Sequence, residues 1–169
     1  MILKNDNLNT KTPILAMKRC ILLVDDDRKR LSLLQGVLSG QYELLSACGA
    51  DEALSMVSAL PNPQDVQLIL AQYHLAGDTG QGLQMLDDIK AIVPKAMRML
   101  TSSPDDADAL RSLTLGASID AYLIESPGTE DIEHRVSHEF GVFQAQTKIP
   151  AFVLNSNNRI CRYDKRILL

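Results

Sequence analysis

The feature that most constrains the fold is an alternation, from residue 18 to residue 140, between short apolar runs and longer amphipathic segments. The apolar runs are rich in Leu, Ile and Val and occupy residues 20–24, 42–47, 66–71, 97–100 and 122–124. After each run, apolar residues recur at helical spacing. Strands that alternate with helices in this way form βαβ units around a parallel sheet. We therefore expect an α/β domain with five parallel strands and five helices.

Composition and charge exclude several classes of protein. With 46% hydrophobic and 22% charged residues in 169, the chain has the composition of a folded globular protein, not of a disordered one. It contains no run of about 20 apolar residues, so we expect no membrane span. Residues 1–147 carry 12 Lys and Arg against 20 Asp and Glu, which argues against nucleic acid as the partner of this part. Cys20, Cys48 and Cys161 lack metal-binding spacing, which favours reduced thiols in the cytoplasm.

Polar side chains follow the predicted strands where each strand ends. They are Asp25, Asp26 and Asp27 after the first strand, Gln72 after the third, Thr101 and Ser102 after the fourth, and Glu125 after the fifth. In an open parallel sheet, ligands gather beyond the carboxyl ends of the strands. These residues are therefore the candidate functional site.

This set of residues, with its spacing, resembles the receiver domain of two-component response regulators over about residues 18–140. The resemblance rests on residues 21–27, on Gly77 and Gly80 in the loop after the third strand, on Thr101, and on the Gly-Ala pair at 116–117 before the last strand. It implies a flavodoxin-like, doubly wound five-stranded parallel sheet with strand order 2-1-3-4-5. It also implies a cytoplasmic signalling module that is not an enzyme and that acts through an output domain, a histidine kinase or a second copy of itself.

The family's functional residues carry over only in part. Its acidic pair, which binds Mg²⁺, corresponds to Asp25 and Asp26, and its switch residues correspond to Thr101 and Tyr122. Two positions depart from the pattern. Gln72 stands where the family has the phosphoacceptor Asp, and Glu125 stands where it has a Lys.

Both replacements act against phosphorylation. The amide of Gln72 is a poor nucleophile because its lone pair is delocalised. Glu125 adds a negative charge to a site that already gathers carboxylates, and we expect this crowding to raise a carboxyl pKa or to be relieved by a divalent cation or an incoming basic side chain. We interpret the chain as a pseudo-receiver, which signals by protein-protein interaction without Asp phosphorylation at the usual position.

Other readings of the same residues stay open. Asp78 is a candidate acceptor if the chain is a working phosphorelay receiver, although Asp is favoured in such turns for local hydrogen bonding. A strand followed by Asp25-x-Asp27 is also how haloacid dehalogenase-type phosphatases begin, but Lys29 stands where that family has Thr or Val. The acidic turn could simply cap the next helix.

His134 and His138 lie four residues apart on a predicted helix, where they could form a metal site. Exposed, solvated side chains explain these two histidines better than a metal site does.

A different pattern follows residue 140. Residues 148–169 carry five Lys and Arg against one Asp, and they include an apolar run, a polar stretch and a second run that predict a hairpin. We divide the chain into an N-terminal extension (1–17), the receiver-like domain (18–140), and a linker with a hairpin or the start of an output domain (141–169). Two strands alone are marginally stable, so we expect this segment either to pair with its copy in a homodimer or to be partly disordered.

Overall fold

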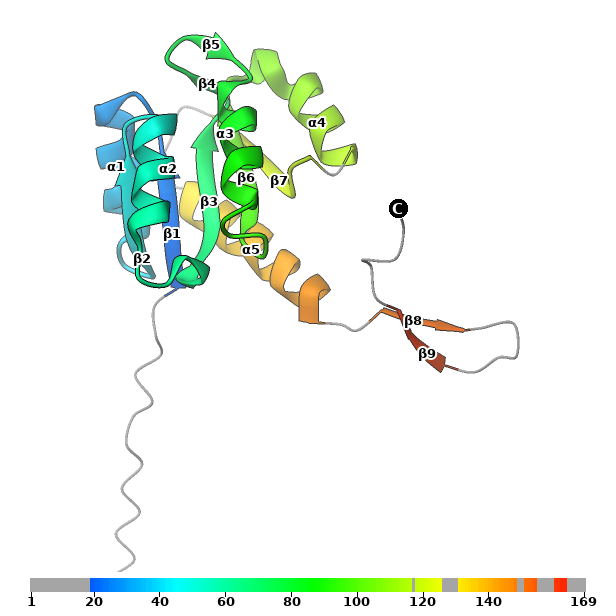
Figure 1. Cartoon of the computed structure of the whole chain (residues 1–169). Coiled ribbons are helices and arrows are strands. Elements are labelled where there is room, and N and C mark those ends of the chain that lie inside the picture. The colour runs from blue at the N-terminus through cyan, green and yellow to red at the C-terminus, as the bar shows by residue number, and fades with distance from the viewer. Residues whose placement is uncertain (1–18, 117, 126–130, 149–150, 155–159, 164–169) are drawn as a thin grey trace, which may run out of the picture.

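A five-stranded parallel sheet forms the centre of the protein (Figure 1). The computed structural model describes residues 19–116, 118–125, 131–148, 151–154 and 160–163. The strands of the sheet are β1 (Arg19–Val24), β2 (Tyr42–Ala47), β3 (Val66–Gln72), β6 (Met97–Ser102) and β7 (Ala121–Ile124). Their order is β2-β1-β3-β6-β7, with every neighbouring pair parallel. The predicted flavodoxin-like topology is confirmed.

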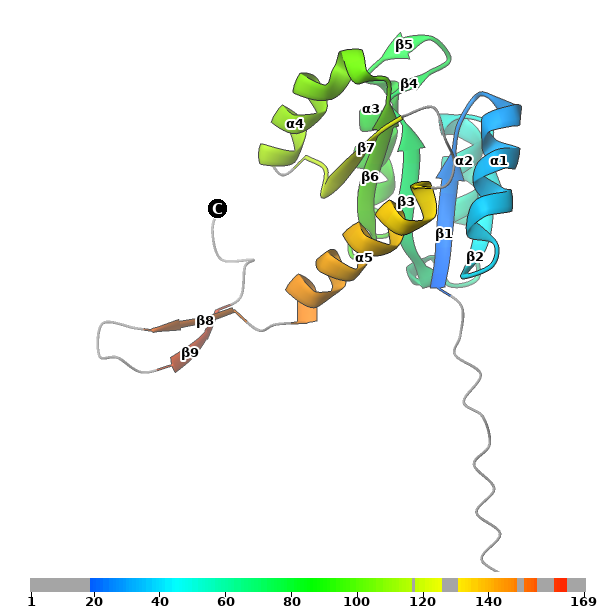
Figure 2. The same ribbon diagram turned by 180° about the vertical axis from the view of Figure 1, so that it is seen from behind.

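Helices cover both faces of this sheet (Figures 1 and 2). They are α1 (Arg28–Leu38), α2 (Ala50–Ala59), α3 (Gln81–Lys90), α4 (Ala107–Leu115) and α5 (Ile132–Lys148), with short 3-10 turns at Pro63–Asp65 and Pro104–Asp106. Buried residues of α1 and α5 share one apolar cluster, and buried residues of α2, α3 and α4 share the other.

The strands divide their side chains between these two clusters with a period of two residues. In β1, Ile21 and Leu23 belong to the cluster of α1 and α5, whereas Leu22 and Val24 belong to the opposite one. All four are at most 1% exposed. A central strand that is covered on both faces needs such an unbroken apolar run, which is why the run was visible in the sequence.

Two features of the loops and termini differ from the sequence prediction. The loop after β3 folds into a small antiparallel hairpin of β4 (His74–Leu75) and β5 (Asp78–Thr79), and Ala76 and Gly77 at its turn have φ of 53° and 79°. In addition, α5 continues to Lys148, so the boundary expected at residue 141 lies inside the helix. The pattern changes after residue 140 in the sequence, but the partly buried Phe143 packs against the same cluster as Val136 and Phe140 and continues the helix.

The predicted C-terminal hairpin is present. Strand β8 (Ala151–Leu154) pairs with β9 (Ile160–Tyr163) in antiparallel register, with Ala151 opposite Tyr163. The N-terminal extension lies outside the described residues. Within the described part of the chain, no helix combines the length and the apolar character that crossing a bilayer requires.

Gly82 gives a test of how α3 packs against the end of β3. A Cβ atom on Gly82 would lie 2.0 Å from the backbone oxygen of Gln72, whereas one on Gly36 of α1 would meet nothing within 4 Å. We expect Gly82→Ala to lower the free energy of unfolding by about 1 to 3 kcal/mol, because the helix must shift away from the strand. In urea denaturation, Gly36→Ala should instead be neutral or stabilising by up to about 1 kcal/mol. Equal effects of the two substitutions would contradict this packing.

Candidate functional site

The carboxyl ends of four strands bring the predicted site residues to one edge of the sheet. The parallel ladders continue one step beyond the strands: Asp25 N donates to Ala47 O at 3.2 Å, Tyr73 N to Thr101 O at 2.9 Å, and Glu125 N to Ser102 O at 2.9 Å. These bonds fix the backbone on both sides of the site. The predicted gathering of the strand-end residues at one edge is therefore observed.

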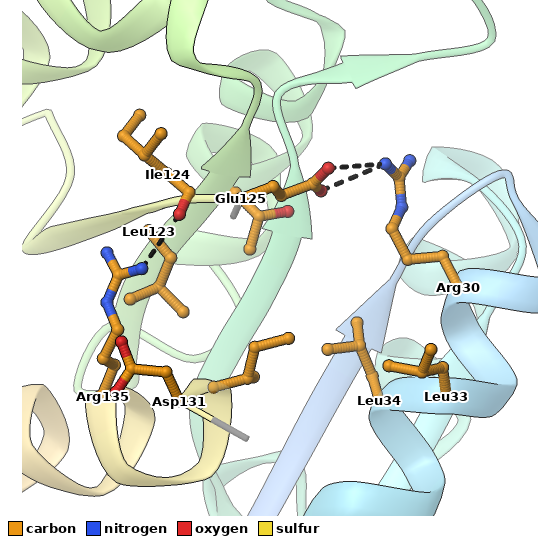
Figure 3. A pocket seen from close by; sticks show the side chains of 10 residues that line it. Arg30, Leu33, Leu34, Leu123, Ile124, Glu125, Asp131 and Arg135 are labelled. Carbon is orange, nitrogen blue, oxygen red and sulfur yellow. Dashed lines mark hydrogen bonds and ion pairs between the residues drawn. The ribbon is translucent and has the colours of Figure 1, made fainter. Parts of the chain in front are cut away.

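Arg30, on the first turn of α1, joins two of these residues. Its Nε lies 2.6 Å from Oδ2 of Asp25, and its Nη2 lies 3.1 Å from Oδ1 of the same carboxylate. Its Nη1 lies 3.1 Å from both carboxylate oxygens of Glu125. Dashed lines mark these two contacts in Figure 3. The side chain of Asp25 is only 2% exposed, whereas those of Arg30 and Glu125 are 29% and 35% exposed. One guanidinium thus compensates a buried carboxylate and a half-buried one.

This ion bridge brings a basic side chain to the crowded carboxylates. Of the outcomes expected from the sequence, the structure contains the incoming basic side chain, and it comes from the chain itself. The hydrogen bond and the charge of Asp25 raise the pKa of Arg30, so the guanidinium stays charged. The sequence contained a clue, since Arg30 lies five residues after Asp25, on the first turn of the following helix.

Gln72 extends the network to the neighbouring strands. Its side chain is buried, and the amide orientation that satisfies both of its ends turns Nε2 toward Thr101 and Glu125. Nε2 then donates to Thr101 Oγ1 at 2.8 Å, to Thr101 O at 3.1 Å and to Glu125 Oε1 at 3.3 Å. The residue at the phosphoacceptor position therefore acts as a hydrogen-bond donor.

The other two acidic residues of the turn lie outside this network. Asp27 is the N-cap of α1, where its Oδ1 accepts from Lys29 N at 2.8 Å and from Arg30 N at 3.4 Å. These backbone donors lower the pKa of Asp27. Asp26 is exposed, and its Oδ2 accepts from Ala76 N at 2.9 Å, which ties the turn after β1 to the β4–β5 hairpin. Of the four acidic residues that the sequence assigns to this site, Asp25 and Glu125 are the two that contact the Arg30 guanidinium.

The arrangement of donors does not suit Mg²⁺ at Asp25 and Asp26. Both oxygens of Asp25 accept from Arg30, and Oδ1 also accepts from Asp27 N at 2.8 Å. Among the described residues, no three His, Cys, Asp or Glu side chains are grouped as metal ligands would be. Mg²⁺ requires several oxygen ligands in near-octahedral geometry, and both oxygens of Asp25 already accept hydrogen bonds from Arg30.

The remaining candidates are more peripheral. Tyr122 lies on β7 opposite Leu100 of β6, partly buried against the cluster of α2, α3 and α4. Asp78 is exposed on β5. His138 is exposed on α5, with its Nδ1 3.5 Å from Oε1 of Glu139, and His134 is also exposed. The two histidines are thus solvated helix residues, as the sequence favoured.

A second polar cluster, which the sequence did not predict, surrounds Asp106 at the start of α4. Its Oδ2 accepts from Ser102 Oγ at 2.5 Å and from Ser103 Oγ at 3.2 Å, and it lies 2.8 Å from His74 Nε2. The Ser102 hydroxyl and His74 lower the pKa of Asp106. These contacts tie the loop after β3 to α4. Because the serines and the histidine converge on the carboxylate, they do not form a nucleophile-base pair.

An open, mostly apolar pocket of about 240 Å³ lies beside the Arg30 bridge, between α1 and α5 (Figure 3). Leu33, Leu34, Leu123 and Ile132 supply much of its apolar wall. Arg30 and Glu125 stand at one side of it, and Asp131 and Arg135 also line it. Arg135 Nη1 donates to the backbone oxygen of Ile124 at 2.9 Å, which connects α5 to the end of β7. The pocket is smaller than most small-molecule sites.

Removal of Arg30 tests the strength of the ion bridge. We expect Arg30→Gln to lower the free energy of unfolding by about 3 kcal/mol, because it leaves the buried Asp25 carboxylate without its cation. Arg28→Gln removes the same charge at an exposed position of the same helix and should cost less than about 0.5 kcal/mol. In a double-mutant cycle by urea denaturation, Arg30→Gln and Asp25→Asn should couple by about 1 to 2 kcal/mol. Strict additivity would show that the two residues do not interact.

The Asp106 cluster should make stability depend on pH in the acid range. Since folding lowers the pKa of Asp106 below its ordinary value of 3.8, its contribution is present above that pH and is lost as the pH falls through the lower folded value. The difference in unfolding free energy between the wild type and Asp106→Asn should therefore be largest near neutral pH and shrink below pH 3.8. Chemical denaturation over this range measures it, and a difference that grows on acidification would contradict the assignment.

Comparison with known proteins supports the fold. No family model matches the sequence, and neither does any curated protein. Among solved structures, the signal receiver domain of an HD domain-containing protein from Pseudomonas fluorescens Pf-5 is similar, with 22% identity and a TM-score of 0.63 over 82% of this chain and 98% of that one. A response regulator receiver domain protein from Clostridium thermocellum has 19% identity and a TM-score of 0.61, over 75% and 98% of the two chains.

A third similar structure is an adenylate cyclase from Rhodopirellula baltica, with 19% identity and a TM-score of 0.66 over 77% of this chain and 93% of that chain. At these identities the comparisons establish the fold. The chain therefore has the fold of response regulator receiver domains.

Proposed function

We propose that this chain is a pseudo-receiver, a cytoplasmic signalling module that works by protein-protein interaction and is not phosphorylated at the usual position. The observation that carries the proposal is the closed network of Arg30, Glu125 and Gln72 at the edge where receiver domains accept a phosphoryl group. The receiver fold of its structural neighbours supports the same assignment.

The chemistry of the network works against phosphoryl transfer. The reaction needs an anionic oxygen nucleophile and positive groups around the transferred oxygens. At the acceptor position, Gln72 presents an amide nitrogen that is already bonded to Thr101 and Glu125. The carboxylate of Glu125 would repel an incoming phosphoryl group, and the positive charge of Arg30 is held by Asp25 and Glu125.

The polar side chains at this edge already have hydrogen-bond and ion-pair partners within the chain. In this proposal, the outer surfaces of the module therefore carry its function. The resemblance to receiver domains assigns partner contacts to the face of α4, β7 and α5, here about residues 105–140. Leu115 at the end of α4 is 80% exposed, which is unusual for a large apolar side chain and fits a contact with another protein. An output domain, a histidine kinase or a second copy of the chain are the partners that this proposal includes.

The enzyme alternative finds little support in the same geometry. A haloacid dehalogenase-type phosphatase would use one Asp of the turn as a nucleophile and the second as an acid and base. Both oxygens of Asp25 are bonded to Arg30, and Asp27 caps α1. We therefore propose that the chain has no catalytic activity of its own.

Phosphoryl transfer from acetyl phosphate tests the proposal. We expect the intact mass of the wild-type chain to stay unchanged after incubation with acetyl phosphate and Mg²⁺, because no carboxylate stands at position 72. As a matched control, the triple variant Gln72→Asp, Glu125→Lys, Arg30→Gln should gain one phosphoryl group, with release of acetate. A gain in the wild type would contradict the proposal, and peptide mapping would then decide among Asp25, Asp26, Asp27 and Asp78.

A further inference from the structure

We propose that the guanidinium of Arg30 is the permanent counter-cation of this acidic edge and excludes divalent metal ions from it. The inference deepens the proposed function and rests on it, since it concerns the same edge and explains how that edge persists without a metal or a phosphoryl group.

The first argument is geometric. The guanidinium uses three nitrogens at once, with Nε and Nη2 on Asp25 and Nη1 on Glu125, at 2.6 to 3.1 Å. A planar fork of this kind matches the two oxygens of a carboxylate better than a point charge does. Arg30 therefore compensates two carboxylates that come from strands β1 and β7, on either side of β3 and β6.

The second argument is that the backbone of Arg30 is held in place. Asp27 caps the first turn of α1 and accepts hydrogen bonds from the backbone nitrogens of Lys29 and Arg30. Because its backbone is already fixed, the Arg30 side chain loses less entropy when it binds the carboxylates than a metal ion loses when it binds them from solution. The ion bridge is therefore favoured over a bound metal ion.

The third argument concerns the oxygens that a metal ion would need. Asp25 offers none that is not already bonded to Arg30, and Asp26 directs Oδ2 to the backbone of Ala76. A divalent ion at Asp25 would also lie next to the positive charge of Arg30 and be repelled by it. Binding of the ion therefore requires that Arg30 first leave both carboxylates.

Titration with Mn²⁺ tests this inference, because the ion is paramagnetic and broadens the amide resonances of nearby residues. For the wild-type chain we expect no local broadening at residues 24–27 and 125. For Arg30→Gln, broadening should appear at these residues, with Mn²⁺ affinity at least about tenfold higher than in the wild type. Arg28→Gln, which removes an exposed charge from the same helix, should behave as the wild type does.

Two outcomes would overturn the inference. One is a wild-type chain whose amide resonances at residues 24–27 and 125 broaden when Mn²⁺ is added, a measurement that needs no variant to fold. The other is a folded Arg30→Gln chain in which Mn²⁺ causes no local broadening. In that case Arg30 would form an ion pair that stabilises the fold without excluding metal ions. If Arg30→Gln does not fold, Arg30→Lys replaces it, and its single ammonium should exclude Mn²⁺ less well than the guanidinium does.

The titration contains no phosphoryl donor, so its result is independent of the phosphorylation test. A chain that excludes Mn²⁺ but gains a phosphoryl group would contradict the proposed function alone. A chain that stays unphosphorylated but binds Mn²⁺ at residues 24–27 would contradict the role of Arg30 alone.

Discussion

The ion bridge from Asp25 through Arg30 to Glu125 is the interaction on which the candidate functional edge of this protein depends. Asp25 is buried at the end of a central strand, and a buried carboxylate is costly unless a cation and hydrogen-bond donors compensate it. Arg30 supplies both. Gln72 and Thr101, on the two strands between Asp25 and Glu125, complete the network, so the ends of β1, β3, β6 and β7 are connected by side chains.

The charges and hydrogen-bonding groups of Arg30, Gln72 and Glu125 complement one another. A Lys at position 125 would repel Arg30, whereas Glu125 attracts it and also accepts a hydrogen bond from Gln72. An Asp at position 72 would place a further carboxylate beside Glu125, whereas the amide of Gln72 adds a donor and no charge. The two departures from the receiver pattern, Gln72 and Glu125, are therefore both compatible with the positive charge of Arg30 at this edge.

The sequence predicted the sheet well because its central strands β1, β3 and β6 are largely buried on both faces, and unbroken apolar runs such as residues 21–24 are easy to recognise. It also placed Asp25, Gln72, Thr101 and Glu125 at one edge of the sheet, because the carboxyl ends of parallel strands lie at the same edge. It could not place Arg30, because a long, flexible side chain can reach several partners and only the geometry of the first turn of α1 selects them.

Other differences have equally local causes. Asp27 belongs to the helix cap because its backbone donors lie two and three residues away, a cap pattern that the sequence analysis left as an alternative. The His74 contact with Asp106 joins residues 32 apart in the chain and has no local pattern. The sequence did not predict the extension of α5 because its pattern changes after residue 140, whereas the packing of Phe143 continues the helix.

The most direct measurement of the central claim is the NMR spectrum of the arginine side chains, recorded with and without Mg²⁺. If Arg30 bridges Asp25 and Glu125, its Nε–H should exchange slowly with water compared with that of the exposed Arg28, and added Mg²⁺ should leave it unchanged. An Arg30 resonance that exchanges as fast as that of Arg28, or that loses its protection when Mg²⁺ is added, would contradict the account.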